Sequence, residues 1–153
     1  MSDQNNKSYS VELAEITARL FSNCNEKEIR HAKQYGVSIG EFRCLRSLFH
    51  KNEPTVNQLA QEMSITSSRV TRIVDGLVAK KLVRRITGET DRRIFNLSLT
   101  PKGEKLAAEL VQKHIKIHEE IIRQIPEDSH QLMIEILGQL NRAVEDWLTE
   151  NDQ

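Results

Sequence analysis

The chain has 153 residues, of which 38% are hydrophobic and 29% are charged. This length and composition predict one folded domain, residues 1–153, and exclude a globally disordered chain. No apolar run approaches the roughly 20 residues of a membrane span. Residues 1–10 are polar and lack the apolar core of a signal peptide, so we expect a cytoplasmic protein without a membrane partner.

Charge is distributed unevenly along the chain, although 22 Lys and Arg residues balance 22 Asp and Glu residues. Residues 66–93 contain eight basic and three acidic side chains, whereas residues 100–153 contain six basic and eleven acidic ones. One basic segment beside a neutral and an acidic segment indicates a single surface for a polyanion. A solvated helix with a charged turn is the alternative that charge alone leaves open.

The first half of the chain reads as a series of helices with polar caps. Apolar spacing predicts a helix over residues 9–34, which Gly36 ends. Ser38 and Glu41 have the spacing of a capping box, and the helix that follows turns Phe42, Leu45, Leu48 and Phe49 inward. Thr55 and Gln58 repeat this spacing before a short helix that runs to Met63.

A further helix and two strands follow. Ser64 and Ile65 form a tight turn, and Thr66 caps a helix that ends near Lys80. Residues 83–87 and 94–99 are strand candidates, and the second alternates with Phe95, Leu97 and Leu99 on one face. The polar residues 88–93 between them begin with glycine and predict a hairpin loop.

Two long amphipathic helices end the chain. Thr100 caps a helix that begins at Pro101 and ends by Pro126. A final helix carries an apolar stripe of Leu132, Ile136, Leu140, Val144, Trp147 and Leu148. These apolar arcs exceed what the small hairpin and short helices can cover, so we expect a second subunit to cover them.

Residues 56–75 have the apolar skeleton of a helix-turn-helix. Leu59 and Ala60 lie in its first helix, and Val70 and Ile73 return the second helix onto the first. Ser64 stands where many such turns have glycine. At the start of the second helix, the skeleton leaves six polar side chains pointing outward: Thr66, Ser67, Ser68, Arg69, Thr71 and Arg72. Side chains of these types bind phosphates and base edges.

The hairpin makes the motif more specific, because a helix-turn-helix followed by two strands is a winged helix. Asp91, Arg92 and Arg93 lie at the tip of the predicted wing. Arginine suits the negative potential of a narrow minor groove. Asp91 is spaced to orient the guanidinium of Arg93. We therefore expect these residues to bind double-stranded DNA.

The stretch that begins at Thr55 resembles the MarR family of winged helix-turn-helix transcriptional regulators. The resemblance rests on LAQEMSI, VTRIVDGLVAKKLVRR, DRR and LSLTPKGEKL, and the flanking helices fit in length and position. It implies a mainly α fold with a β-hairpin wing. Residues 38–100 would form the DNA-binding lobe, and residues 1–36 and 101–153 would form dimerisation helices.

The resemblance also implies a function. A homodimer of interlocked first, fifth and sixth helices would bind a pseudo-palindromic operator, in most cases as a repressor that a small ligand or oxidation releases. Ser68, Arg69, Thr71 and Arg72 would face the major groove, and Asp91 and Arg93 would form the wing tip. Of the effectors, we favour a small organic ligand over zinc or oxidation.

The sequence offers candidates for three kinds of sensing site: a redox cysteine, a metal site and an effector pocket. Cys24 is a redox candidate, but its place beside Leu20 favours a buried, inert thiol, and Cys44 favours this more strongly. His114 and His118 lie one helical turn apart, yet two ligands do not make a metal site. His31, Arg43, Arg46 and His114 are candidates for an effector pocket that binds an aromatic acid, or else are solvated.

Other classes of function find less support. We find no P-loop, GxGxxG or HExxH motif, so we expect no enzyme and no cofactor. A winged helix that binds only protein would lack arginine and hydroxyl side chains on its second helix and a basic wing tip. Because both features are present here, we favour DNA over a protein-interaction module.

Overall fold

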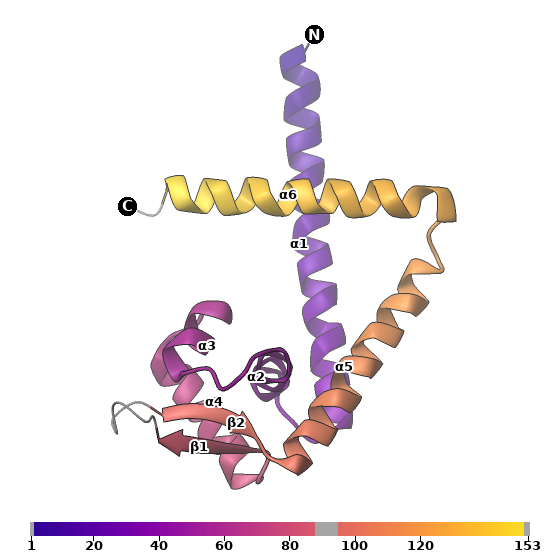
Figure 1. Ribbon diagram of the computed structural model, residues 1–153. Coiled ribbons are helices and arrows are strands. Elements are labelled where there is room, and N and C mark those ends of the chain that lie inside the picture. Colours follow the sequence, from indigo (N-terminus) through magenta and orange to yellow (C-terminus); the bar gives the residue numbers. More distant parts are fainter. Residues whose placement is uncertain (1, 88–94, 152–153) are drawn as a thin grey trace. The chain divides into compact units, whose positions relative to one another are not determined.

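The computed structural model describes the backbone of residues 2–87 and 95–151. It describes the side chains of residues 7–87 and 95–151. The chain forms two compact units, Met1–Gln112 and Lys113–Gln153. The element order is α1 (Ser2–Gln34), α2 (Ile39–His50), α3 (Val56–Glu62), α4 (Ser67–Ala79), β1 (Val83–Thr87), β2 (Phe95–Leu99), α5 (Pro101–Ile122), the 3-10 turn η1 (Glu127–Ser129) and α6 (His130–Glu150) (Figure 1). The boundary between the units falls within α5. In the described part of the chain, no helix is long and apolar enough to cross a membrane.

The predicted caps are present and set where the helices begin. Ser38 and Glu41 form a capping box at α2, and Thr55 and Gln58 form another at α3. At the end of α1, Gly36 adopts a φ of 67°, which an L side chain tolerates poorly. The prediction of these three helix boundaries is confirmed.

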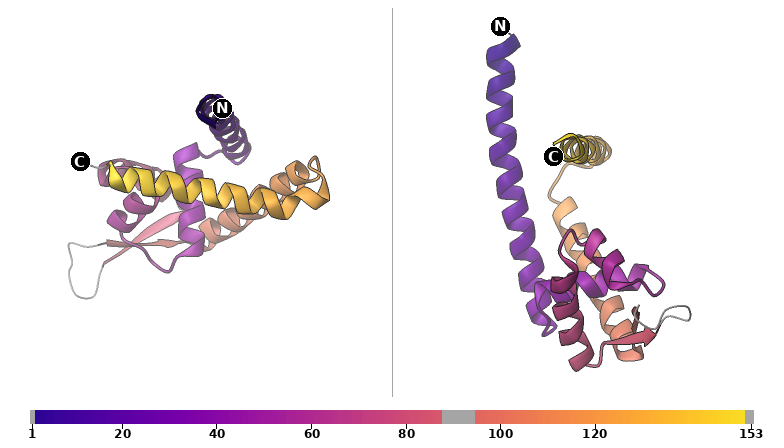
Figure 2. Two further views of the ribbon diagram at one scale, coloured as in Figure 1. Left: turned by 90° about the horizontal axis from the view of Figure 1, so that it is seen from above. Right: turned by 90° about the vertical axis from the view of Figure 1, so that its left-hand side faces the viewer.

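The first unit holds the buried core. Helices α1, α3 and α4 and strand β2 all contact α2, which lies beside the C-terminal end of α1 (Figure 2, right). Phe42, Leu45, Leu59 and Leu97 are fully buried, as are Val70, Val74 and Leu77 of α4. Burial of large aliphatic and aromatic side chains supplies about 1.5–3 kcal/mol each. This core holds the short helices, which are too brief to be stable alone.

The two strands form an antiparallel hairpin with Val83 opposite Leu99 and Arg85 opposite Leu97. A bridge pairs Thr55 with Asn96, and the backbone N–H of Leu97 donates to the carbonyl of Pro54 at 2.9 Å. These contacts connect β2 to the residues before α3. The base of the wing is thereby anchored to the helix-turn-helix.

Two predictions about apolar faces need correction. Phe49 is 41% exposed rather than inward, because it shares the helix side of Phe42 and Leu45 but lies next to the last residue of α2, where that side is incompletely covered. Phe95 shares the sheet face of Leu97 and Leu99 but is 44% exposed, because it lies at the end of β2 farther from the core.

The second unit contains the end of α5, η1 and α6. Helix α5 ends at Ile122, earlier than predicted, because the backbone tightens to i+3 bonds at Gln124 and Ile125. His130 Nε2 lies 3.1 Å from the carbonyl oxygen of Ile122 and 2.9 Å from that of Ile125. The imidazole thus lies against two carbonyls at and just beyond the end of α5, where carbonyls lack the i+4 donor of a continued helix.

Candidate nucleic-acid interface

The turn between α3 and α4 has the geometry that the sequence predicts. Met63 is the C-cap of α3, and the backbone N–H of Ile65 donates to the carbonyl of Ala60 at 3.0 Å. Ser64 adopts a φ of 51°, the left-handed conformation that glycine adopts most easily. Thr66 caps α4 by accepting from the N–H of Arg69. Ser64 therefore occupies the glycine-like position of a helix-turn-helix.

Helix α4 has one buried and one exposed side. Val70, Val74 and Leu77 have no exposed surface. Arg69 and Arg72 are exposed because their positions fall on the opposite side of a helix of 3.6 residues per turn. The core thus turns two guanidinium groups outward, and each carries five donors for phosphate or guanine.

The hydroxyl groups of α4 are already ordered by local hydrogen bonds. Ser67 Oγ donates to Asn57 Oδ1 on α3 at 2.8 Å, and Thr71 Oγ1 donates to the carbonyl of Ser67 at 2.9 Å. Thr66 Oγ1 lies 3.1 Å from Ser68 Oγ. These bonds orient the side chains at the start of the helix before any ligand arrives.

An ion pair joins α4 to the wing. Arg85 of β1 donates to Asp75 of α4 at 2.5 Å, and both side chains are partly exposed. The pair restrains the angle between the helix and the first strand. Asp91, Arg92 and Arg93, the predicted wing tip, lie outside the described residues.

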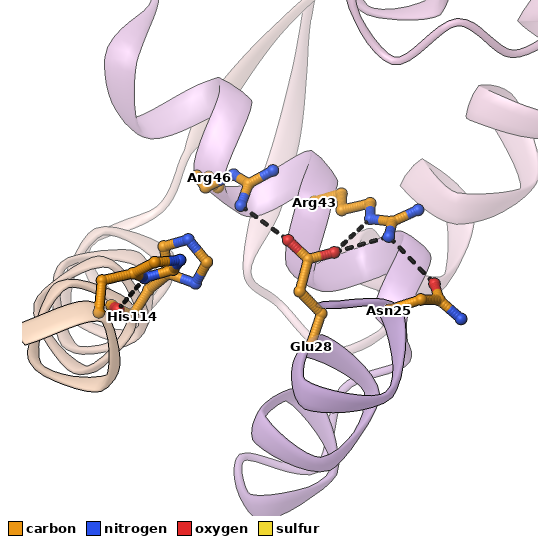
Figure 3. Close-up of polar contacts among 6 residues, drawn as sticks. Asn25, Glu28, Arg43, Arg46 and His114 are labelled. Atoms are coloured by element: carbon orange, nitrogen blue, oxygen red, sulfur yellow. Dashed lines mark hydrogen bonds and ion pairs between the residues drawn. The ribbon is translucent and has the colours of Figure 1, made fainter. Parts of the chain in front are cut away.

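Arg43 and Arg46, two of the predicted pocket residues, converge on one carboxylate (Figure 3). Glu28 of α1 accepts from Arg43 Nε at 2.8 Å and from Arg46 Nη1 at 3.1 Å. Asn25 also accepts from Arg43 Nη2, at 3.2 Å. Burial alone would raise the pKa of Glu28, but the hydrogen bonds and charges of the two arginines outweigh it and lower that pKa.

The predicted histidines lie in both units. His31 is buried in the first unit, with its ring edge-on to Tyr35 at 5.4 Å and to Phe42 at 5.2 Å between centroids. His114 and His118 belong to the second unit, where His118 Nδ1 lies 2.8 Å from the carbonyl oxygen of His114. Among the described residues, no group of three or more His, Cys, Asp or Glu side chains could hold a metal ion.

The two cysteines differ in environment. Cys44 is buried, and burial, followed by the charges of Glu41 and Glu62, raises the pKa of its thiol to about 12. Cys24 is exposed, so the prediction that it is buried beside Leu20 is wrong for the chain as described. The reason is that Leu20 itself is 48% exposed, so the apolar side of α1 is not part of the buried core at this level.

Sequence reasoning missed three contributors to this region: Glu28, Asn57 and the Asp75–Arg85 pair. Asn57 and Asp75 lie within the helix-turn-helix, but both are ten residues from the partner that they contact. Glu28 lies 15 residues before Arg43. The only sequence signal for these pairs is opposite charge, between Asp75 and Arg85 and between Glu28 and the two arginines.

This arrangement, a capped α4 behind a helix-turn and before a two-stranded hairpin, defines the winged helix-turn-helix class of fold. Residues 37–95 match the model of the MarR family. The chain is 27% identical over 128 residues to the HTH-type transcriptional regulator MhqR of Bacillus subtilis, covering 84% of this chain and 88% of that protein.

Solved structures agree with the sequence match. A crystal structure of a MarR family transcription regulator aligns with a TM-score of 0.87 at 18% identity, covering 98% of this chain and 99% of the other. The crystal structure of Streptococcus pneumoniae FabT in complex with DNA aligns with a TM-score of 0.79 at 26% identity, covering 90% and 99%. The chain is thus similar to the MarR family, in sequence over residues 37–95 and in fold over most of its length.

Proposed function

We propose that the protein is a sequence-specific DNA-binding transcriptional regulator whose α4 is the recognition helix. The observation that carries this proposal is the exposure of Arg69 and Arg72 opposite the fully buried face of α4. The relatives support it, because MhqR is named a transcriptional regulator and FabT is described in complex with DNA. Phosphate contacts would supply most of the affinity, and contacts to base edges the selectivity.

We further propose that the regulator is a homodimer on a pseudo-palindromic operator. Large apolar side chains are exposed on α1, among them Leu13, Ile16 and Phe21, and on α6, among them Ile136 and Trp147. Exposed apolar surface of this extent marks an interaction site. Two-fold symmetry would place the two recognition helices about 34–36 Å apart, one turn of DNA.

Repression that a small organic ligand relieves is the finer part of the proposal. His31, Arg43 and Arg46 of the first unit remain the proposed pocket residues, and His114 of the second unit remains a separate candidate. An anionic ligand would have to compete with Glu28, which already accepts hydrogen bonds from both arginines. Zinc at His114 and His118 and oxidation of the exposed Cys24 remain the alternatives, as does a role as a protein-interaction module.

Titration of the full-length protein against duplex DNA tests the proposal. A binding site would be selected from a random duplex pool and compared with its scrambled sequence at two salt concentrations. We expect tight, salt-sensitive and selective binding by a dimer. Equal affinity for the two duplexes would refute sequence-specific regulation and favour an interaction module.

Variants locate the surface. Arg72→Ala should weaken binding and blur sequence preference, whereas Arg93→Ala should weaken binding to all duplexes and lower the salt slope by about 1. The exposed Arg123 provides the matched control, because Arg123→Ala removes the same charge outside the helix-turn-helix. If both Arg72→Ala and Arg93→Ala bind like the wild-type protein, the assignment of this surface is wrong.

A further inference from the structure

Asn57 and Ser67 join the two helices of the helix-turn-helix at the edge of the proposed DNA-binding surface. Asn57 is the second residue of α3, and Ser67 is the first residue of α4. The hydroxyl of Ser67 donates to Asn57 Oδ1 at 2.8 Å, and both side chains are exposed. The bond is therefore formed at the surface, where a bound duplex would meet it.

The direction of this bond restricts what Ser67 can do. A serine hydroxyl has one proton to donate and two lone pairs that accept. Because the proton of Ser67 is directed to Asn57, the lone pairs remain for a partner outside the protein. Phosphate oxygens only accept hydrogen bonds, so Ser67 in this state is suited to a donor rather than to the DNA backbone.

In the major groove, the bases that donate hydrogen bonds are adenine and cytosine, through their exocyclic amino groups. Guanine and thymine present acceptors there, and arginine side chains can donate to them. Arg69 and Arg72 are exposed, and arginine only donates. Ser67 would thus add an acceptor to a surface dominated by donors.

We propose that Asn57 is a specificity-determining residue that acts through Ser67. By accepting the proton of the Ser67 hydroxyl, Asn57 turns Ser67 into a hydrogen-bond acceptor that reads the amino group of an adenine or a cytosine. Asn57 is a positioning residue in this scheme, and Ser67 makes the base contact. This inference rests on the proposed function.

The remaining hydroxyls do not reproduce this arrangement. Thr71 also directs its proton inward, to the carbonyl of Ser67, but it is only partly exposed. In the pair of Thr66 and Ser68, either hydroxyl can be the donor, so the polarity of Ser68 is not set by a neighbour. Among these side chains, the fixed polarity of an exposed hydroxyl belongs to Ser67.

The test measures discrimination at single positions of the selected duplex. Each adenine or cytosine is replaced in turn by an analogue that lacks only the exocyclic amino group, and affinity for the full-length protein is measured. For the wild-type protein, we expect one such replacement in each half-site to weaken binding about threefold to tenfold, the value of a single net hydrogen bond.

Substitutions at Asn57 should then distinguish its orientation of the Ser67 hydroxyl from an effect of charge on DNA binding. Asn57→Ala should abolish the amino-group preference at that position, and the double variant with Ser67→Ala should discriminate no differently from Ser67→Ala alone. Asn57→Asp keeps an acceptor for Ser67 and should keep the preference, although its negative charge weakens binding to every duplex. Asn52→Ala, at an exposed asparagine of the preceding loop, is the control and should leave discrimination unchanged.

The outcomes are distinguishable. A wild-type protein that binds the selected and scrambled duplexes equally would overturn the proposed function and this inference with it. Selective binding that tolerates the loss of every amino group would overturn only the inference, as would full discrimination by Asn57→Ala. Unchanged melting temperatures for the variants, expected because both side chains are exposed, would exclude a merely structural effect.

Discussion

Gly103 lies in the first turn of α5, where this helix approaches the residue before β1 most closely. A methyl group added there would stand 1.9 Å from the carbonyl oxygen of Leu82 and 2.8 Å from its carbonyl carbon. The same oxygen accepts a hydrogen bond from the backbone N–H of Thr100 at 3.0 Å, whereas the Thr100 hydroxyl donates to the carbonyl of Lys81 at 2.8 Å and lies 3.3 Å from that of Leu82. Gly103→Ala would therefore force the backbone apart and weaken the hydrogen bond from the Thr100 N–H.

The expected loss of stability follows from three contributions. Overpacking costs about 1–3 kcal/mol, and the upper end applies because the obstacle is backbone. The weakened backbone hydrogen bond removes about 1 kcal/mol more. Alanine recovers about 1 kcal/mol through its helix propensity. We expect the free energy of unfolding to fall by about 3 kcal/mol and the melting temperature by about 10 °C.

Urea and thermal unfolding, followed by circular dichroism, would measure this loss. Gly138→Ala in α6 is the matched control, because its methyl group would meet nothing of its own chain closer than Arg142 Nη1, at 3.7 Å. We expect this control to gain about 1 kcal/mol. If Gly103→Ala were as stable as the wild-type protein, the close approach of α5 to Leu82 would be refuted.

Three further predictions concern the turn, the thiols and the joint between α1 and α2. Ser64→Gly should raise the free energy of unfolding by about 0.5–1 kcal/mol, because glycine adopts the φ of 51° without strain; lower stability in a urea titration would contradict this. At protein concentrations at which the proposed dimer dissociates, Cys24 should react with a thiol reagent in the folded chain, whereas Cys44, whose thiol pKa burial raises to about 12, should react only on unfolding; equal rates for the Cys24→Ser and Cys44→Ser variants would refute the difference. The folded-state pKa of Glu28 lies below its ordinary value of 4.5, so its stabilising effect is present above that pH and is lost as the pH falls through the folded pKa. Stability of Glu28→Gln should depend less steeply on pH in acid than that of the wild-type protein, as urea titrations between pH 3 and pH 6 would show.

The limits of helices and strands are largely predictable here because their signals are local. Each capping box joins residues three positions apart, so Ser38 with Glu41 and Thr55 with Gln58 can be recognised without knowing the fold. The 3.6-residue period of α4 likewise separates buried Val70 from exposed Arg69.

Exposure at the ends of elements is harder to predict from sequence, as Phe49 and Cys24 show. Periodicity tells which side of a helix a residue occupies, but not whether another element reaches far enough to cover it. Phe49 lies near the end of α2, and Cys24 lies on α1 beside Leu20, which is itself 48% exposed. Both were expected to be buried, and both are exposed.

The sequence by itself determined where α2, α3, α4 and α5 begin, the helix-turn-helix register and the arginine-bearing side of α4, because these depend on hydrogen bonds and periodicities within a few residues. Tertiary structure alone decided that Glu28 joins Arg43 to Arg46 and that Asn57 takes the proton of Ser67. Those contacts join residues 10 to 18 positions apart on different helices. Their partners are chosen by the angles at which helices pack around the core, which depend on the whole set of buried side chains rather than on any local pattern.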